Sequence, residues 1–309
     1  MAAGLYLDLA VGSDVSGAEV WERPSLYAKN INVGCPPDEC NQKGQDWGLP
    51  PMVPQKLKNL GYAPIVSILR NTMQYGGALR LDHVMGLMRL FWIPKGIDGT
   101  QGTYVQYPFD DLLGILALES HRNQCLIIGE NLGTVPDLVQ QRMDEWGILS
   151  YKVLYFERHS LGQFKAPEDY PQKALVALST HDLPTIKGFW ESEDIDVRTE
   201  LDLYPNDQFR TEQIENRIHE RAGILNALRD AGTLHEGADQ DSTTMPFALS
   251  ESVHQFLTKT PCHVLMVQLE DIFEQPKLWP FDHLKGIDRK QLKGLQNQKR
   301  ATMPEQNPH

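Results

Sequence analysis

Short apolar segments recur along this chain, and longer segments with a helical spacing of apolar residues separate them. Each short segment is almost continuously apolar and ends in a polar or charged residue. A strand needs continuous rather than alternating hydrophobicity when both of its faces are buried, as in a parallel sheet covered by helices. The predicted strands span residues 4–9, 78–82, 125–130, 150–156, 174–181 and 262–269.

The segments between these strands predict helices. The stretch 110–121, for example, begins with acidic residues, which favour a helix N-terminus, and spaces its leucines on one side. The predicted helices span residues 61–75, 110–121, 136–146, 208–232 and 247–259. Alternating strands and helices indicate an α/β protein with a parallel sheet. A closed (β/α)8 barrel and an open doubly wound sheet both fit. The sequence has no GxGxxG turn and no GxxxxGK[ST] loop.

Composition excludes several function classes. The 309 residues carry a net charge of −12, so we expect no nucleic-acid partner and no anionic membrane surface. No apolar run approaches the roughly 20 residues of a membrane helix, and the first residues lack the basic region of a signal peptide. Four cysteines are too few for a disulfide framework in a chain of this length. We therefore expect free thiols and a cytoplasmic location.

Two long connections, residues 11–52 and 183–261, interrupt the alternation. In a barrel, such insertions lie on the face where the strands end and where active sites are built.

Three predicted strands end at a carboxylate: Asp82, Glu130 and Asp182. Any one of them could be a helix cap or a solvated loop residue. Two opposed carboxyl groups, however, are what glycoside cleavage needs. Arg80 lies two residues before Asp82 and shares its strand face, where it would favour the ionised form of the carboxylate.

Aromatic residues could supply a surface for sugar rings, whose C–H faces pack on aromatic planes. Trp47 lies among glycines and prolines, and Tyr104 and Tyr107 lie close together in another segment. Phe91 and Trp92 follow the Asp82 segment, but their apolar run favours a place in the core.

Together these residues closely resemble the 4-alpha-glucanotransferases, also called amylomaltases or disproportionating enzymes, of bacterial maltodextrin metabolism. The matching stretches are residues 5–12, 35–38, 44–52, 78–84, 129–133, 151–157 and 180–185. The similarity is collinear from residue 4 to residue 273.

The resemblance implies a (β/α)8 TIM barrel of the alpha-amylase-like kind, which decides between the two architectures. It implies that Asp82 is the nucleophile, Glu130 the general acid/base and Asp182 the transition-state stabiliser. The substrate-binding residues that it implies are Arg80, His83, His181, Asp38, Gln45, Trp47, Gly48 and Glu157. Maltodextrins and other α-1,4-glucans are the implied substrates, and no metal or nucleotide cofactor is implied.

The implied reaction transfers α-1,4-glucan segments by a retaining double displacement through a covalent intermediate on Asp82. An α-glucan hydrolase of the same clan is one alternative. An inactive, truncated product that only binds glucans is the other.

The chain departs from the family pattern in three places. Asn131 stands where the family usually has Asp after the acid/base. The proline-glycine-threonine and asparagine-tryptophan-arginine motifs expected after the last strand are missing. Six strand–helix units are present where a barrel has eight, and nothing before Gly4 corresponds to the first two strands. We therefore expect an incomplete barrel at residues 1–273, a poorly ordered tail at 274–309, and a chain that folds poorly alone.

Overall fold

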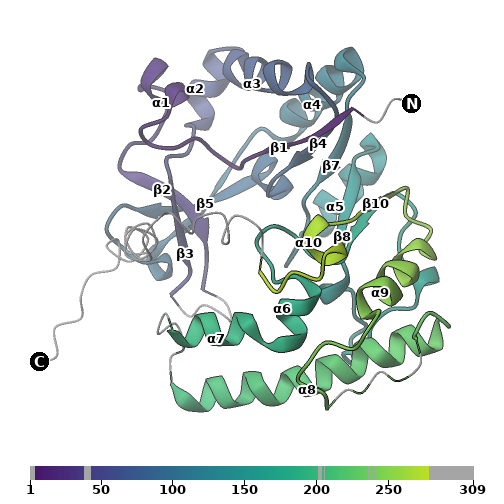
Figure 1. Ribbon diagram of the computed structural model, residues 1–309. Helices are drawn as coiled ribbons and strands as arrows, with labels where there is room; N and C mark the ends of the chain where they lie inside the picture. Colours follow the sequence, from purple (N-terminus) through teal and green to yellow (C-terminus); the bar gives the residue numbers. More distant parts are fainter. Residues whose placement is uncertain are drawn as a thin grey trace, which may run out of the picture. The chain divides into compact units, whose positions relative to one another are not determined.

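The computed structural model describes residues 4–37, 43–200, 204, 206–235, 237, 239 and 241–277 (Figure 1). These residues form two compact units. One contains the described residues up to Ser150, and the other begins at Tyr151. Within the described ranges, no helix is long and apolar enough to cross a membrane.

A parallel sheet forms the centre of the first unit. Its strands are β1 (Leu5–Leu9), β4 (Gly76–Leu81), β7 (Leu126–Gly129) and the start of β8 (Leu149–Val153), hydrogen-bonded in that order. Leu9 pairs with Leu81, which in turn pairs with Gly129. The residues that follow β4 and β7 therefore leave the sheet at the same edge.

Helices α3 (Ala63–Met73), α4 (Phe109–Asn123) and α5 (Asp137–Trp146) pack with this sheet to form the hydrophobic core of the first unit. Figure 1 shows α3 and α4 beside each other in the first unit. The shorter helices of this unit are α1 (Ala18–Glu22) and α2 (Pro54–Asn59). The buried core cluster contains Leu69, Met73, Leu79, Leu81, Val84, Leu113, Leu116, Cys125, Ile127, Val139, Met143 and Ile148.

A buried carboxylate joins α3 to α4. Glu119 accepts hydrogen bonds from Arg70 at 2.7 and 2.9 Å and from Arg122 at 2.8 Å. Its side chain is only 2% exposed, so both oxygens depend on these arginines rather than on water.

We expect Glu119→Gln to lower the free energy of unfolding by about 1–3 kcal/mol, because it removes the buried charge that accepts hydrogen bonds from both half-exposed arginines. Urea denaturation measures the change. Glu145→Gln is the matched control, because Glu145 makes a similar pair with Arg142 at 2.8 Å at the surface. Its effect should stay below about 0.5 kcal/mol, and an equal loss in both variants would contradict the prediction.

A second, antiparallel sheet also belongs to the first unit. Its order is β3 (Gln45–Leu49), β2 (Ile31–Cys35), β5 (Arg89–Pro94) and β6 (Thr103–Gln106). The sequence pattern predicted no strands here, because β2 and β3 lie among Gly, Pro and Asp rather than in a continuous apolar run. β2 and β3 approach so closely that a Cβ atom on Gly34 would lie 1.8 Å from a carbonyl oxygen of β3.

The second unit contains two parallel strands, β9 (Ala174–Ala177) and β10 (Val264–Met266). The long connection between them forms helices. In chain order these are α6 (Ile186–Glu191), α7 (Glu193–Glu200), α8 (Asp207–Asp230) and α9 (Leu249–Thr258), and α10 (Leu269–Ile272) follows β10. In Figure 1, α8 is the long green helix.

All six predicted strands exist, but most are shorter than predicted. The segment predicted at 150–156 ends as a strand at Val153 and continues as a turn of 3-10 helix over Leu154–Phe156. The segment predicted at 174–181 ends at Ala177, and its polar residues form the turn described below. The pattern missed α6 and α7, which lie inside a connection predicted as an insertion.

Candidate active site

Arg80 joins two carboxylates at the end of β4. Its Nη2 lies 2.7 Å from Oδ1 of Asp82, and its Nη1 lies 2.8 and 2.9 Å from the two oxygens of Asp8. Burial opposes the charge of Arg80, but the hydrogen bonds to Asp8 and the charge of Asp82 keep the pKa of the guanidinium above its usual value. Asp82 is 31% exposed, so its carboxylate remains accessible beside a fixed positive charge.

Asp8 is a site residue that the sequence reasoning missed. It lies on β1 and pairs in register with Arg80 on β4. The available signal was a single acidic residue inside the otherwise apolar stretch Leu5–Leu9.

Glu130 follows β7 and is only 8% exposed. The backbone N–H of His83 donates to its Oε2 at 3.0 Å, and that of Leu132 donates to its Oε1 at 2.6 Å. Burial, and to a smaller extent the charge of Asp82, raises the pKa of Glu130, while the two amides and Arg80 oppose the rise. The carboxyl group therefore lies next to the backbone that carries Asp82, with its protonated form favoured.

His83 and Trp47 form one wall of this site. The backbone of His83 is left-handed (φ 48°, ψ 61°), a conformation that costs energy in a non-glycine residue. Its ring lies edge-on to Trp47, with 5.3 Å between the ring centroids and an interplanar angle of 81°. Burial lowers the pKa of His83 although Asp82 opposes this, so a neutral imidazole lies beside the indole.

Hydrogen bonds between neighbouring residues stabilise the strand that carries Trp47. The indole N–H donates to Oε1 of Gln45 at 3.0 Å, and the N–H of Gly48 donates to Oδ1 of Asp46 at 2.8 Å. Gly48 has φ 72°, which glycine adopts readily. Gln45, Trp47 and Gly48 thus form one ordered segment, while Asp38 lies outside the described residues.

Asn131 ties the loop after β7 to two other elements. Its buried side-chain amide donates to Oε1 of Gln140 on α5 at 2.8 Å and to Oγ of Ser150 on β8 at 3.2 Å. This site uses Asn131 as a donor, a role that an ionised Asp could not fill.

Asp82 and His83 also border a cavity of about 420 Å³ in the first unit. The rest of its lining is mainly aliphatic and includes Leu9, Leu81 and Leu87. Asp82 therefore lines a mainly apolar cavity while its side chain stays 31% exposed.

In the second unit, His181 and Asp182 lie on a turn between β9 and α6. The N–H of Asp182 donates to Oγ1 of Thr180 at 3.2 Å, and the hydroxyl of Ser179 donates to the carbonyl of Pro184 at 2.8 Å. Ser179 and Thr180 are buried, whereas the Asp182 side chain is 75% exposed. The turn therefore presents an exposed carboxylate, whose Oδ2 lies 3.4 Å from Nε2 of His181, on a buried base.

Glu157, also in the second unit, differs from the other predicted substrate-binding residues. It is buried, and its carboxylate lies 2.7 Å from Nζ of Lys165 and 3.6 Å from Nζ of Lys152. Both lysines would compete with a sugar hydroxyl for this carboxylate.

The structure thus brings the Arg80–Asp82–His83 segment together with Glu130 and Trp47 in the first unit. Asp182 and Glu157 belong to the second unit. Among the described side chains, no group of three or more His, Cys, Asp or Glu could hold a metal ion.

Comparison with known proteins identifies the family of this chain. A model of the 4-alpha-glucanotransferase family matches residues 2–308. The 4-alpha-glucanotransferase of Haemophilus influenzae is 43% identical over 277 residues, covering 89% of this chain and 39% of the relative. That of Mycobacterium tuberculosis is 37% identical over 275 residues, covering 88% and 37%. The chain therefore spans about two fifths of the length of the curated relatives it matches.

Solved structures give the same result for the fold. Amylomaltase from Corynebacterium glutamicum superposes with a TM-score of 0.81 at 34% identity, covering 87% of this chain and 39% of that one. Amylomaltase from Streptococcus agalactiae, solved in complex with acarbose, shares the fold with a TM-score of 0.68 at 19% identity, covering 88% and 49%. These matches confirm the predicted α/β fold, a partial TIM-type barrel of the amylomaltase kind. The chain belongs to the 4-alpha-glucanotransferase family.

Proposed function

We propose that this chain carries the catalytic residues of a retaining, cytoplasmic 4-alpha-glucanotransferase that moves α-1,4-glucan segments between maltodextrins. One observation carries the proposal. Buried Glu130, whose pKa is raised by burial, is hydrogen-bonded to the amide that follows Asp82, while Asp82 itself faces a guanidinium. One carboxyl group is thus suited to give up a proton, and the other is suited to attack as an anion.

The reaction follows from these two environments. Glu130 protonates the glycosidic oxygen while Asp82 attacks the anomeric carbon, so the first glucan leaves with the proton and a glycosyl-enzyme forms. The carboxylate of Glu130 then takes the proton from the 4-hydroxyl of a second glucan, which attacks the anomeric carbon and releases Asp82. Two inversions give net retention.

The remaining roles belong to the same proposal, within a catalytic part at residues 1–273. Asp182 stabilises positive charge in the transition state from the turn after β9. The residues that bind the reacting and neighbouring sugars are Arg80, His83, His181, Asp38, Gln45, Trp47, Gly48 and Glu157.

Incubation of the full-length protein with maltotriose tests the function. A transferase produces glucose together with maltopentaose and longer chains, without new reducing ends, and proton NMR shows α-linked products. A hydrolase instead increases the number of reducing ends and forms no chain longer than the donor. No turnover at all would support the inactive glucan-binding alternative and contradict the proposal.

The neutral residue after the acid/base should affect its pH range. Asn131→Asp adds a negative charge beside Glu130, which favours the protonated carboxyl group and raises its pKa. The protonated acid then persists to higher pH, so the alkaline limb of kcat/KM should move upward by up to about one pH unit. The measurement is maltotriose transfer from about pH 4 to about pH 9.

Asn131→Ala serves as the control, because it removes the hydrogen bonds of Asn131 without adding charge. It should lower stability and leave the alkaline limb in place. A downward shift in Asn131→Asp, or an equal shift in both variants, would contradict the electrostatic explanation.

A further inference from the structure

The helix that follows the Asp182 turn is fastened at both ends. The turn leads directly into α6, whose N-cap is Thr185. The hydroxyl oxygen of Thr185 accepts the N–H of Gly188 at 3.0 Å, and the hydroxyl donates to the carbonyl of Gln275 at 2.7 Å. Because only Leu183 and Pro184 separate Thr185 from Asp182, the position of α6 sets the position of this carboxylate.

A buried carboxylate holds the first turn of α6. Asp271, on α10, is 0% exposed and accepts the N–H of Ile186 at 2.8 Å through Oδ1. The hydroxyl of Ser250 on α9 donates to the carbonyl of Asp271 at 2.7 Å. A negative charge at this end of a helix is favourable. A residue from far along the chain thus fixes the point where the Asp182 turn becomes a helix.

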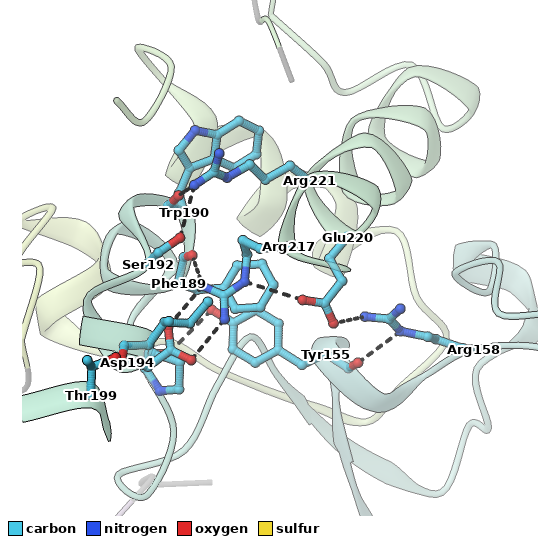
Figure 2. Close-up of polar contacts among 12 residues, drawn as sticks. Tyr155, Arg158, Phe189, Trp190, Ser192, Asp194, Thr199, Arg217, Glu220 and Arg221 are labelled. Atoms are coloured by element: carbon cyan, nitrogen blue, oxygen red, sulfur yellow. Dashed lines mark hydrogen bonds and ion pairs between the residues drawn. The ribbon is translucent and has the colours of Figure 1, made fainter. Parts of the chain in front are cut away.

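Two buried arginines of α8 hold the other end. Figure 2 shows Arg217 donating to the carbonyl oxygen of Phe189 and Arg221 donating to that of Trp190. Arg217 also binds both oxygens of Asp194, at 2.9 and 2.8 Å, and its guanidinium lies 4.0 Å from the centroid of the Phe189 ring. These positive charges complement the C-terminal end of α6, where the helix dipole is negative.

This arrangement costs folding stability. Within the described ranges, Oδ2 of Asp271 and Nε of Arg221 are buried without a hydrogen-bond partner, and Arg221 meets no carboxylate at ion-pair distance. Burial raises the pKa of Asp271 to about 6, although the hydrogen bond from Ile186 and, to a smaller extent, His254 on α9 oppose the rise. Burial and the charge of Arg217 lower the pKa of Arg221. Buried, incompletely paired charges destabilise a fold, so packing alone does not account for them.

We propose that Asp271, Arg217 and Arg221 are positioning residues that clamp α6 at both ends and so fix the backbone that presents Asp182 to the reacting sugar. The inference rests on the proposed function, in which Asp182 stabilises the transition state. It assigns a role to α8 and α10, neither of which carries a predicted site residue.

The test compares Asp271→Ala with Asp271→Asn in the full-length protein. The Ala variant loses the acceptor for Ile186, so kcat for maltotriose should fall by about 10- to 100-fold with little change in KM. The Asn variant keeps an oxygen acceptor and should retain most of kcat. Hydrogen exchange of residues 180–188, followed by mass spectrometry, should accelerate in the Ala variant alone.

Phe256→Leu is the control, because Phe256 is a buried residue of α9 whose ring lies edge-on to that of Tyr170, with 6.4 Å between the ring centroids. It should lower Tm without changing exchange in the turn. Arg221→Gln weakens the contact of α8 with the C-terminal end of α6, so it should also lower kcat. It is the second variant for this test if Asp271→Ala does not fold.

The proposal is overturned if the Ala variant loses thermal stability only, with kcat per folded molecule and turn exchange equal to those of the control. A wild-type protein without transfer activity would instead contradict the proposed function. In that case, hydrogen exchange of residues 180–188 in the Asp271 variants would still show whether Asp271 fixes the start of α6.

Discussion

Asp82→Asn should reduce the rate of maltotriose transfer by at least about 10³-fold, because the amide cannot form the glycosyl-enzyme. In the proposed reaction Asp82 is the nucleophile. It is partly exposed, and Nη2 of Arg80 lies 2.7 Å from its Oδ1. The substitution preserves size and can still accept a hydrogen bond from Arg80, so the fold should persist. Initial rates with maltotriose, together with Tm, measure both effects.

Asp8→Asn is the matched control for Asp82→Asn. Asp8 lies on the other side of the same guanidinium, at 2.8 and 2.9 Å, and changes no reacting atom. Loss of one charge-assisted pair should reduce the rate by about tenfold, far less than loss of the nucleophile. If the two variants lose activity equally, Asp82 acts through Arg80 rather than by direct attack, and the nucleophile assignment is wrong.

The contrast between Asp82 and Asp8 shows what the sequence can predict. Arg80 and Asp82 lie two residues apart on one strand, so their shared face follows from the period of a strand. Asp8 meets Arg80 only through the pairing of β1 with β4. That register depends on all the residues between them, and no local pattern encodes it.

The same distinction applies to the fold. The parallel strands were predictable because each is a continuous apolar run that ends in polar residues. The antiparallel sheet of β2, β3, β5 and β6 was not, because its strands are stabilised by pairing across the sheet rather than by a strong local pattern. The buried contact of Asp271 with Ile186 joins residues 85 positions apart, and it was missed for the same reason.

Glu130→Gln should reduce transfer from maltotriose by about 10²- to 10⁴-fold, because it removes both the acid of the first step and the base of the second. The surroundings of Glu130 favour this role. Burial raises its pKa above the usual value, and among the described residues two backbone amides hydrogen-bond its carboxylate. The carboxyl group of Glu130 therefore loses its proton only as pH rises through this raised pKa. The wild-type rate should fall on the alkaline side as the protonated form is lost.

The choice of donor separates the role of Glu130 from that of Asp82. α-Maltosyl fluoride has a leaving group that needs no proton, so the first step should recover in Glu130→Gln. The glycosyl-enzyme should then accumulate on Asp82, where mass spectrometry of the intact protein detects it, since no base activates the acceptor. Azide is a nucleophile that needs no base, and it should release the sugar as the α-azide. Asp82→Asn should form no glycosyl-enzyme, and any product that it forms with azide should be the inverted β-azide. An α-azide from Asp82→Asn, or no glycosyl-enzyme in Glu130→Gln, would reverse the assignment of the two carboxylates.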